Sequence, residues 1–166
     1  NGTALQYLLG ELKDNPSVVL AAVNENGNAL EHASPRLQDD PTVVLAAVRE
    51  YGGALKYASP RLRNDSTIVL AAVSRNGEAL KYASVEMKDD EAIVIAALAC
   101  EVETKTLALE VCQYASPEIR NNIGFMLSEV IPRNPAASRH ASLSLWCDPD
   151  FFQEAMKQND DERQYA

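Results

Sequence analysis

A phrase of six apolar residues recurs four times in the chain at a spacing of 25 residues. It reads VVLAAV at residues 18–23 and 43–48, IVLAAV at 68–73 and IVIAAL at 93–98. A fixed period of this length is typical of repeat proteins, in which each unit buries its apolar side chains against its neighbours. The chain is therefore expected to form a stack of similar units.

Each copy carries residues that favour the start and the end of a helix. In the second copy, Asp40 and Pro41 are preferred at the N-cap and at the first helical position. Gly52, like Gly27 and Gly77 in the neighbouring copies, is expected to end this helix in the left-handed conformation. The helix between these signals is apolar on nearly all sides, so we expect it to be buried.

The rest of each copy predicts two further helical segments. Residues 54–58 are expected to form a short second helix, and Ser59 to cap a final turn over residues 61–64. The sequence thus predicts an all-α fold, an α-solenoid of short ~25-residue helical repeats. Residues 1–98 hold the regular repeats. Residues 99–166 are expected to form an irregular C-terminal third of the same solenoid, with degenerate repeats and a C-terminal cap.

The regular pattern breaks in the fourth copy. Val102 replaces the expected glycine, and the next tyrosine of the repeat, Tyr114, follows after 32 residues instead of 25. Seven extra residues make about two helical turns. We expect either one continuous helix from Glu91 towards Tyr114 or two lengthened helices with a turn near Glu103 and Thr104. The insertion is either tolerated without effect or bends the array to shape a binding surface.

The two ends of the chain fall within a repeat. Residues 1–5 (NGTAL) match residues 26–30 (NGNAL), and the final Tyr-Ala pair matches residues 57–58. We therefore expect the chain to be a segment of a longer protein.

The composition excludes several classes of protein. A formal charge of −9 argues against nucleic-acid binding, which requires a basic surface. No apolar run reaches the ~18 residues of a membrane span, so a soluble protein is expected. Cys100, Cys112 and Cys147 match no zinc spacing and imply no disulfide framework, which favours a reducing compartment.

No arrangement of residues in the sequence points to catalysis. There is no phosphate-binding loop and no serine elbow. The aspartate pairs at 39–40 and 89–90 are expected to cap helices rather than to bind a metal. A nucleophilic Cys147 with His140 as its base is disfavoured, because His140 fills a regular repeat position. We therefore expect no enzyme activity, no cofactor, no metal site and no small-molecule substrate.

One position of the repeat is aromatic in every copy. It is occupied by Tyr7, His32, Tyr57, Tyr82, Tyr114, His140 and Tyr165. These rings are expected either to pack between repeats with their polar tips at the surface or to form a ridge for a partner protein, since tyrosine is enriched at binding hot spots. Tyr57, Tyr82 and Tyr114 are therefore candidate partner-binding residues.

Basic residues near this position suggest a second candidate site. Lys56, Lys81, Arg36, Arg61 and Arg63 are predicted to form a basic stripe for an acidic partner or a phosphorylated lipid headgroup. Acidic residues interrupt this stripe, so a solvated charged face is the alternative.

Trp146 is the remaining candidate partner-binding residue. Its equivalents in the other copies are Gln38, Arg63, Lys88 and Arg120. Because those residues are polar, the indole is expected either to join an exposed apolar docking patch or to be covered by the terminal copy.

The regular copies also resemble a known family. Residues 54–65 (ALKYASPRLRND), followed by IVLAAV at 68–73 and Asn76-Gly77, closely resemble the domain of unknown function 4116 repeat family. The resemblance is specific over roughly residues 1–100 and weak beyond them. Members of this family occur in protist proteins and in effectors that intracellular bacterial pathogens inject into host cells. The resemblance implies a segment of such an effector, acting in the host cytosol, or of a protist protein, and it transfers no catalytic residue.

Together these features predict a non-enzymatic helical-repeat scaffold that binds a protein partner. The partner is expected to be a host protein or another part of the parent protein. The first alternative is a module that binds acidic lipids or phosphoinositides. The second is a regulatory or catalytic domain of an effector enzyme.

Overall fold

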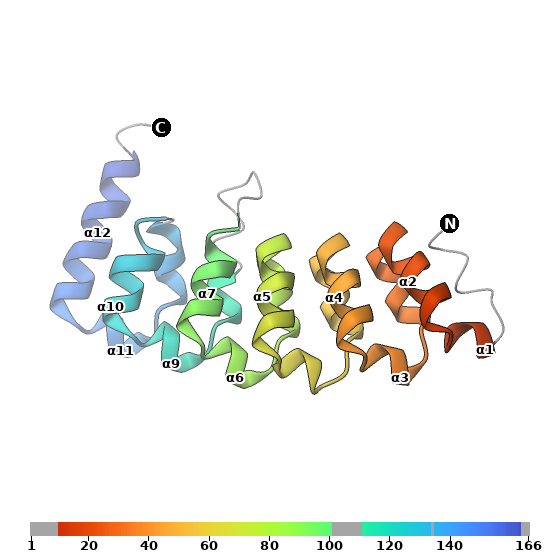
Figure 1. Cartoon of the computed structure of the whole chain (residues 1–166). Coiled ribbons are helices and arrows are strands. Elements are labelled where there is room, and N and C mark those ends of the chain that lie inside the picture. Colours follow the sequence, from red (N-terminus) through yellow and green to blue (C-terminus); the bar gives the residue numbers. More distant parts are fainter. Residues whose placement is uncertain (1–9, 101–110, 134, 164–166) are drawn as a thin grey trace.

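The helices of the chain lie side by side in an elongated row (Figure 1). The computed structural model describes residues 10–100, 111–133 and 135–163. Every regular element in these residues is helical, which confirms the predicted all-α fold. The long helices contact their neighbours in the order α2 (Pro16–Glu25), α4 (Pro41–Glu50), α5 (Ser66–Arg75) and α7 (Glu91–Leu98).

A six-residue 3-10 helix follows the α-helix in each of the first three repeats. These helices are η2 (Gly27–His32), η3 (Gly52–Tyr57) and η5 (Gly77–Tyr82). A short turn then leads to the next repeat, and it is formed by α3 (Pro35–Gln38), η4 (Leu62–Asn64) and α6 (Val85–Lys88). The array therefore has two layers, with an α face on the side of the α-helices and a 3-10 face on the side of the 3-10 helices.

The predicted helix starts are confirmed at the aspartates. The Oδ1 atom of Asp40 accepts hydrogen bonds from the backbone N–H groups of Thr42 (2.8 Å) and Val43 (3.3 Å). Asp90 makes the same two bonds at the start of α7. These bonds satisfy N–H groups that have no partner within the helix.

The core lies between the two layers. Val43, Val44, Ala47 and Val48 of α4 are buried there, and each fully buried valine contributes roughly 1.5–3 kcal/mol. The helix that was expected to be buried is therefore buried along one side only, and its opposite side forms the α face. Leu70, on the matching side of α5, is 36% exposed.

The repeat glycines serve a different purpose from the one predicted. None of the described glycines has a positive φ, so the expected left-handed helix ends are wrong. Instead, each 3-10 helix begins directly against the α-helix of the next repeat. A Cβ atom on the glycine would lie 2.4 Å from a backbone carbonyl oxygen in the pairs Gly27–Ala47, Gly52–Ala72 and Gly77–Ala97. Only glycine allows this close approach.

Helix α7 ends at Leu98, so the prediction of one continuous helix from Glu91 to Tyr114 was wrong. The alternative turn near Glu103 and Thr104 falls outside the described residues. The carbonyl of Ala97 lies against Gly77 as in the other repeats, so α7 keeps the contact with the preceding repeat although it is shorter than α4 and α5.

A serine joins each repeat to the one before it. The backbone N–H of Ser59 donates to the carbonyl of Gln38 (2.9 Å), and its hydroxyl donates to Asp39. The hydroxyl oxygen also accepts the N–H of Leu62 (3.3 Å). We call this arrangement the serine clasp. It recurs at Ser34, Ser84 and Ser116.

The C-terminal third continues the row with shorter elements. They are α9 (Pro117–Arg120), α10 (Ile123–Phe125), the π-helical turn η6 (Met126–Val130), η7 (Pro135–His140), α11 (Leu143–Trp146) and α12 (Pro149–Arg163). Phe151 and Ala155 of α12 are buried in the same core as the regular repeats. The last long helix therefore packs on this core through one side.

Candidate functional site

The aromatic repeat position lies at the end of the 3-10 helices. His32, Tyr57 and Tyr82 are the last residues of η2, η3 and η5, and all three are half-buried. Tyr114 and His140 are half-buried as well. The tyrosine rings pack against the core, as the packing interpretation expects. Tyr7 and Tyr165 lie outside the described residues.

Lysine side chains lie against the tyrosine rings of the 3-10 face, and one of them, Lys81, contacts two rings. The Nζ atom of Lys56 lies 4.4 Å from the ring centroid of Tyr57. The Nζ atom of Lys81 lies 5.2 Å from the centroid of Tyr82 and 5.9 Å from that of Tyr114. Each cation–π contact at an exposed site contributes roughly 0.5–1 kcal/mol. We call these five residues the tyrosine–lysine ladder, and it continues without a gap across the seven-residue insertion.

Acidic residues hold the polar ends of the ladder in place. The hydroxyl of Tyr57 donates to Glu31 (2.7 Å), and Lys81 pairs with Glu78 (3.0 Å). The bond to Glu78 raises the pKa of Lys81, and the contact with the Tyr57 hydroxyl raises the pKa of Lys56. Both lysines are therefore positively charged at neutral pH.

The predicted basic stripe is divided between three environments. Lys56 and Lys81 belong to the ladder, whereas Arg36 and Arg61 are engaged by the previous repeat. Arg61 donates from Nε to the Asp39 carboxylate (3.1 Å) and from Nη2 to the Asp39 carbonyl (2.7 Å). Arg36 makes the same pair of bonds to Asp14. These two arginines thus take part in contacts between repeats.

Arg63 belongs to a third environment that the sequence analysis did not identify. It is the fourth residue after the clasp serine, and the residues at this position are Gln38, Arg63, Lys88, Arg120 and Trp146. We call Arg63, Lys88 and Arg120 the cationic row. Lys88 and Arg120 were noted in the sequence only as equivalents of Trp146, although their shared position and charge were the signal that could have found them.

Trp146 is half-buried at the C-terminal end of the row. Its ring makes T-shaped contacts with Phe151 at 5.3 Å and with Phe152 at 6.2 Å between centroids. Phe151 is fully buried and Phe152 is 48% exposed. The indole is thus partly covered by α12, and Phe152 is the more exposed ring of this cluster.

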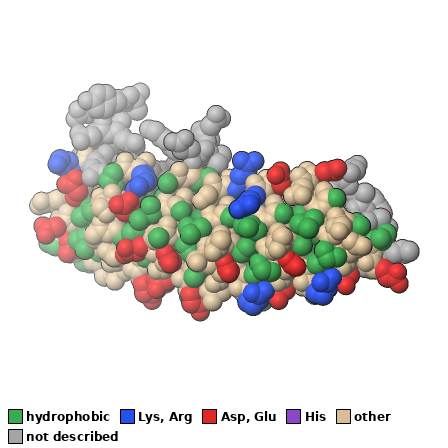
Figure 2. Space-filling model, viewed as in Figure 1, with side chains coloured by type: hydrophobic (Ala, Val, Ile, Leu, Met, Phe, Trp, Pro, Cys, Tyr) green, Lys and Arg blue, Asp and Glu red, His purple; other side chains and the backbone are tan. Residues whose placement is uncertain are grey.

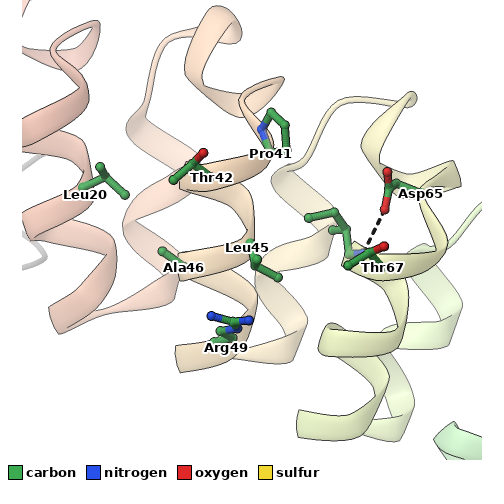
Figure 3. Close-up of a pocket in the computed structure, with 9 residues that line it drawn as sticks. Leu20, Pro41, Thr42, Leu45, Ala46, Arg49, Asp65 and Thr67 are labelled. Carbon is green, nitrogen blue, oxygen red and sulfur yellow. Dashed lines mark hydrogen bonds between the residues drawn. The ribbon is translucent and has the colours of Figure 1, made fainter.

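The α face carries a shallow hollow of about 490 Å³ that the sequence did not indicate. Leu20 of α2, Leu45 and Arg49 of α4, and Thr67 of α5 contribute to its lining (Figure 3). Asp65 at its rim caps α5 through the N–H of Ile68 (3.1 Å). Hydrophobic side chains extend along the same face (Figure 2). The hollow is mainly apolar and contains no cysteine or histidine.

The cysteines and histidines show no shared site. Cys147 is exposed, and His140 is half-buried with its pKa lowered by burial and by Arg139 and Arg120. Burial raises the pKa of Cys112 to about 11, so its thiol is protonated at neutral pH. Over the described ranges, no three His, Cys, Asp or Glu side chains come together to hold a metal ion. No helix in the same ranges has the length and hydropathy of a membrane span.

The regular repeats match a known family model. The model, described as Domain of unknown function (DUF4116), matches residues 1–38, 40–88 and 67–99. Comparisons with curated proteins and with solved structures give no significant match. The matched segments together span more than half of the chain and include the repeats that form α2, α4, α5 and α7. The chain therefore belongs to the DUF4116 family.

Proposed function

We propose that this chain is a non-enzymatic helical-repeat scaffold that binds a protein partner through its 3-10 face. The observation that carries this proposal is the continuity of the tyrosine–lysine ladder, in which Lys81 lies within 6 Å of the rings of both Tyr82 and Tyr114. The ladder residues occupy three successive repeats, and Lys81 bridges the last two. Stacked repeats commonly use such surfaces for protein recognition.

The chemistry of the ladder suits a protein interface. A half-buried tyrosine loses little conformational freedom on binding, because the core already fixes its ring. Tyrosine combines a large apolar surface with a polar tip, and it is enriched among residues that dominate binding energy. We propose a host protein or another segment of the parent protein as the partner, because the family resemblance implies an effector that acts in the host cytosol.

Affinity capture with mass spectrometry tests this proposal. Proteins captured from a host-cell lysate by the wild-type chain are compared with those captured by a variant carrying Tyr57→Ala and Tyr82→Ala. A second variant, Lys56→Ala with Lys81→Ala, changes the ladder without removing its rings from the core. A variant with Arg49→Ala and Thr67→Ala on the α face is the matched control.

The proposal predicts a protein that the wild type and the control capture and that both ladder variants lose. Circular dichroism melting must show that the lysine variant folds. If a folded lysine variant and the wild type capture the same proteins, the ladder is not the binding surface.

Membrane targeting is the alternative with less support. Two of the five basic residues proposed for lipid binding, Arg36 and Arg61, are held by Asp14 and Asp39. Flotation of the chain with vesicles containing phosphatidylserine or a phosphoinositide tests this alternative, and a chain that stays in the soluble fraction argues against it. A regulatory or catalytic domain of an effector enzyme is the second alternative, and it predicts a change in the activity of an adjoining enzyme.

A further inference from the structure

Three basic side chains occupy the same position in successive repeats. Arg63, Lys88 and Arg120 each follow the clasp serine by four residues, and each is partly buried. The clasp bonds hold these positions in register, because Ser84 donates to the carbonyl of Arg63 and Ser116 donates to the carbonyl of Lys88, both at 2.9 Å. The cationic row is thus a regular feature of the array.

The cationic row has no acidic partner within the part of the chain that the structure describes. Arg63 and Arg120 each have a buried Nε atom without a hydrogen-bond acceptor. Arg36 and Arg61 provide the contrast, because each donates two hydrogen bonds to an aspartate. An unsatisfied buried donor is costly. Since no described acidic side chain pairs with either guanidinium, a ligand carboxylate would make a charge-assisted contact there that the chain itself does not supply.

The electrostatics of the row also favour an anion. Burial, and then the charge of Arg63, lower the pKa of Lys88. Like charges therefore lie close together in a protein whose formal charge is −9. A bound anion relieves this repulsion.

The row lies beside the tyrosine–lysine ladder. Gln38, which holds the row position in the first repeat, donates from Nε2 to the backbone carbonyls of Leu30 (3.1 Å) and Glu31 (3.3 Å). The side chain of the same Glu31 accepts the hydroxyl of Tyr57. In the first repeat, the row position therefore lies close to the residue that holds the hydroxyl of Tyr57.

The repeat spacing indicates the shape of the ligand. Neighbouring packed helices are about 8–10 Å apart. Because the cations occupy equivalent positions of successive repeats, we infer a similar spacing for them. A polyproline II helix advances about 3.1 Å per residue with three residues per turn, which places every third side chain on one side at about 9 Å intervals. Aromatic surfaces also favour proline-rich segments in this conformation.

We propose that the cationic row binds an extended, polyproline II-like segment of the partner that carries a carboxylate at every third residue. The carboxylates pair with Arg63, Lys88 and Arg120, and the residues between them contact the ladder tyrosines. This inference rests on the proposed function and specifies the chemistry of the partner.

Two synthetic peptides of identical composition test the inference. One contains four Glu-Pro-Ala units, and the other places its four glutamates in one block ahead of the prolines and alanines. Binding of each labelled peptide to the full chain is measured by fluorescence anisotropy at low salt. The protein variants are Arg63→Gln and Arg120→Gln, which are expected to fold because Gln38 occupies this position in the first repeat. Arg49→Gln, on the α face, is the matched control.

The inference predicts that the spaced peptide binds more tightly than the block peptide. Each row variant should bind the spaced peptide about tenfold more weakly than the wild type, because a hydrogen bond to a charged group is lost. The control Arg49→Gln should bind it as tightly as the wild type. Equal binding of the two peptides overturns the inference, and so does unchanged binding by folded row variants. Equal competition by a single-stranded oligonucleotide or by phosphatidylserine vesicles also overturns it, because the row would then bind any polyanion.

The two proposals fail in different ways. If a captured protein is lost by the ladder variants and kept by the row variants, the proposed function stands and this inference is wrong. If the spaced peptide binds through Arg63 and Arg120 but no protein is captured, the ligand chemistry stands and the proposed function is wrong.

Discussion

The hydroxyl of Ser116 donates a 2.5 Å hydrogen bond to the carboxylate of Asp89, which lies 27 residues earlier in the chain. The equivalent pair Ser59 and Asp39 is separated by 20 residues. The seven additional residues therefore leave the contact between these repeats unchanged. This agrees with the interpretation of the insertion as a tolerated one.

Ser116→Ala should lower the free energy of unfolding by about 1–2 kcal/mol. The alanine variant loses the bond to Asp89 and the acceptor for the N–H of Ile119 (3.0 Å), at a side chain that is buried. Urea titration followed by circular dichroism measures this change. Ser128→Ala, at an exposed position, is the control and should change stability by less than about 0.5 kcal/mol. An equal effect of both substitutions would show that the clasp contributes nothing.

Gly52→Ala should lower the free energy of unfolding by about 1–3 kcal/mol, because the added methyl group would lie 2.4 Å from the carbonyl oxygen of Ala72. Gly124→Ala is the matched control, since its Cβ would lie 3.4 Å from the nearest atom, the Oδ1 of Asn122. That variant should be neutral or slightly more stable. A neutral Gly52→Ala in the same urea titration would contradict the close approach of the repeats.

Acid should weaken the contact between Asp39 and the next repeat. The hydroxyl of Ser59 and then the guanidinium of Arg61 lower the pKa of Asp39 below its ordinary value of 3.8. Because the folded pKa is below the unfolded one, this stabilisation is present above pH 3.8 and is lost as the pH falls through the lower, folded pKa. Melting temperatures from pH 6 to pH 2 should fall less steeply for Asp39→Asn than for the wild type. Parallel curves would contradict this linkage.

The cysteines should differ strongly in their reaction with iodoacetamide. Cys147 is exposed, whereas Cys112 is buried with a pKa raised to about 11. Since the thiolate is the reactive form, mass spectrometry at pH 8 should find Cys147 modified well before Cys112. Addition of urea should remove the difference. Equal rates in the native chain would place Cys112 at the surface.

Phe151→Ala should destabilise the C-terminal end by about 3–5 kcal/mol, because its ring is fully buried against Trp146. Trp146 is the only tryptophan in the chain, so its fluorescence reports this site alone. The emission of the variant should shift to longer wavelength. Phe152→Ala is the control, and a similar shift there would indicate that both rings cover the indole equally.

The sequence predicted the ends of helices correctly where the residues that determine them lie within a few positions of each other. The helix starts at Asp40 and Asp90 follow from cap chemistry within a few residues. The purpose of Gly52 could not be predicted in this way, because it depends on a carbonyl in the following repeat. The end of α7 at Leu98 could not be predicted either, because neither glycine nor proline marks it in the sequence.

The candidate site was only partly predictable. The spacing of the tyrosines identified the ladder, but the pairing of Arg61 with Asp39 depends on the register between repeats. The cationic row required a comparison of charge at one position across copies, together with the knowledge that Arg63 and Arg120 lack acceptors. Periodicity in a sequence identifies equivalent positions, whereas the contacts between repeats decide which of them remain unpaired.

The contact of a repeat glycine with the next carbonyl has a consequence for the growth of such chains. A duplicate of residues 40–64 placed after residue 64 would present its own glycine and serine to the same complementary groups on either side. The array is therefore extendable by single-unit gene duplication without compensating substitutions. Each duplication would add a second copy of the ladder tyrosine, Tyr57, and of the row arginine, Arg63, so that copy number alone would set how long a partner segment the protein can accommodate.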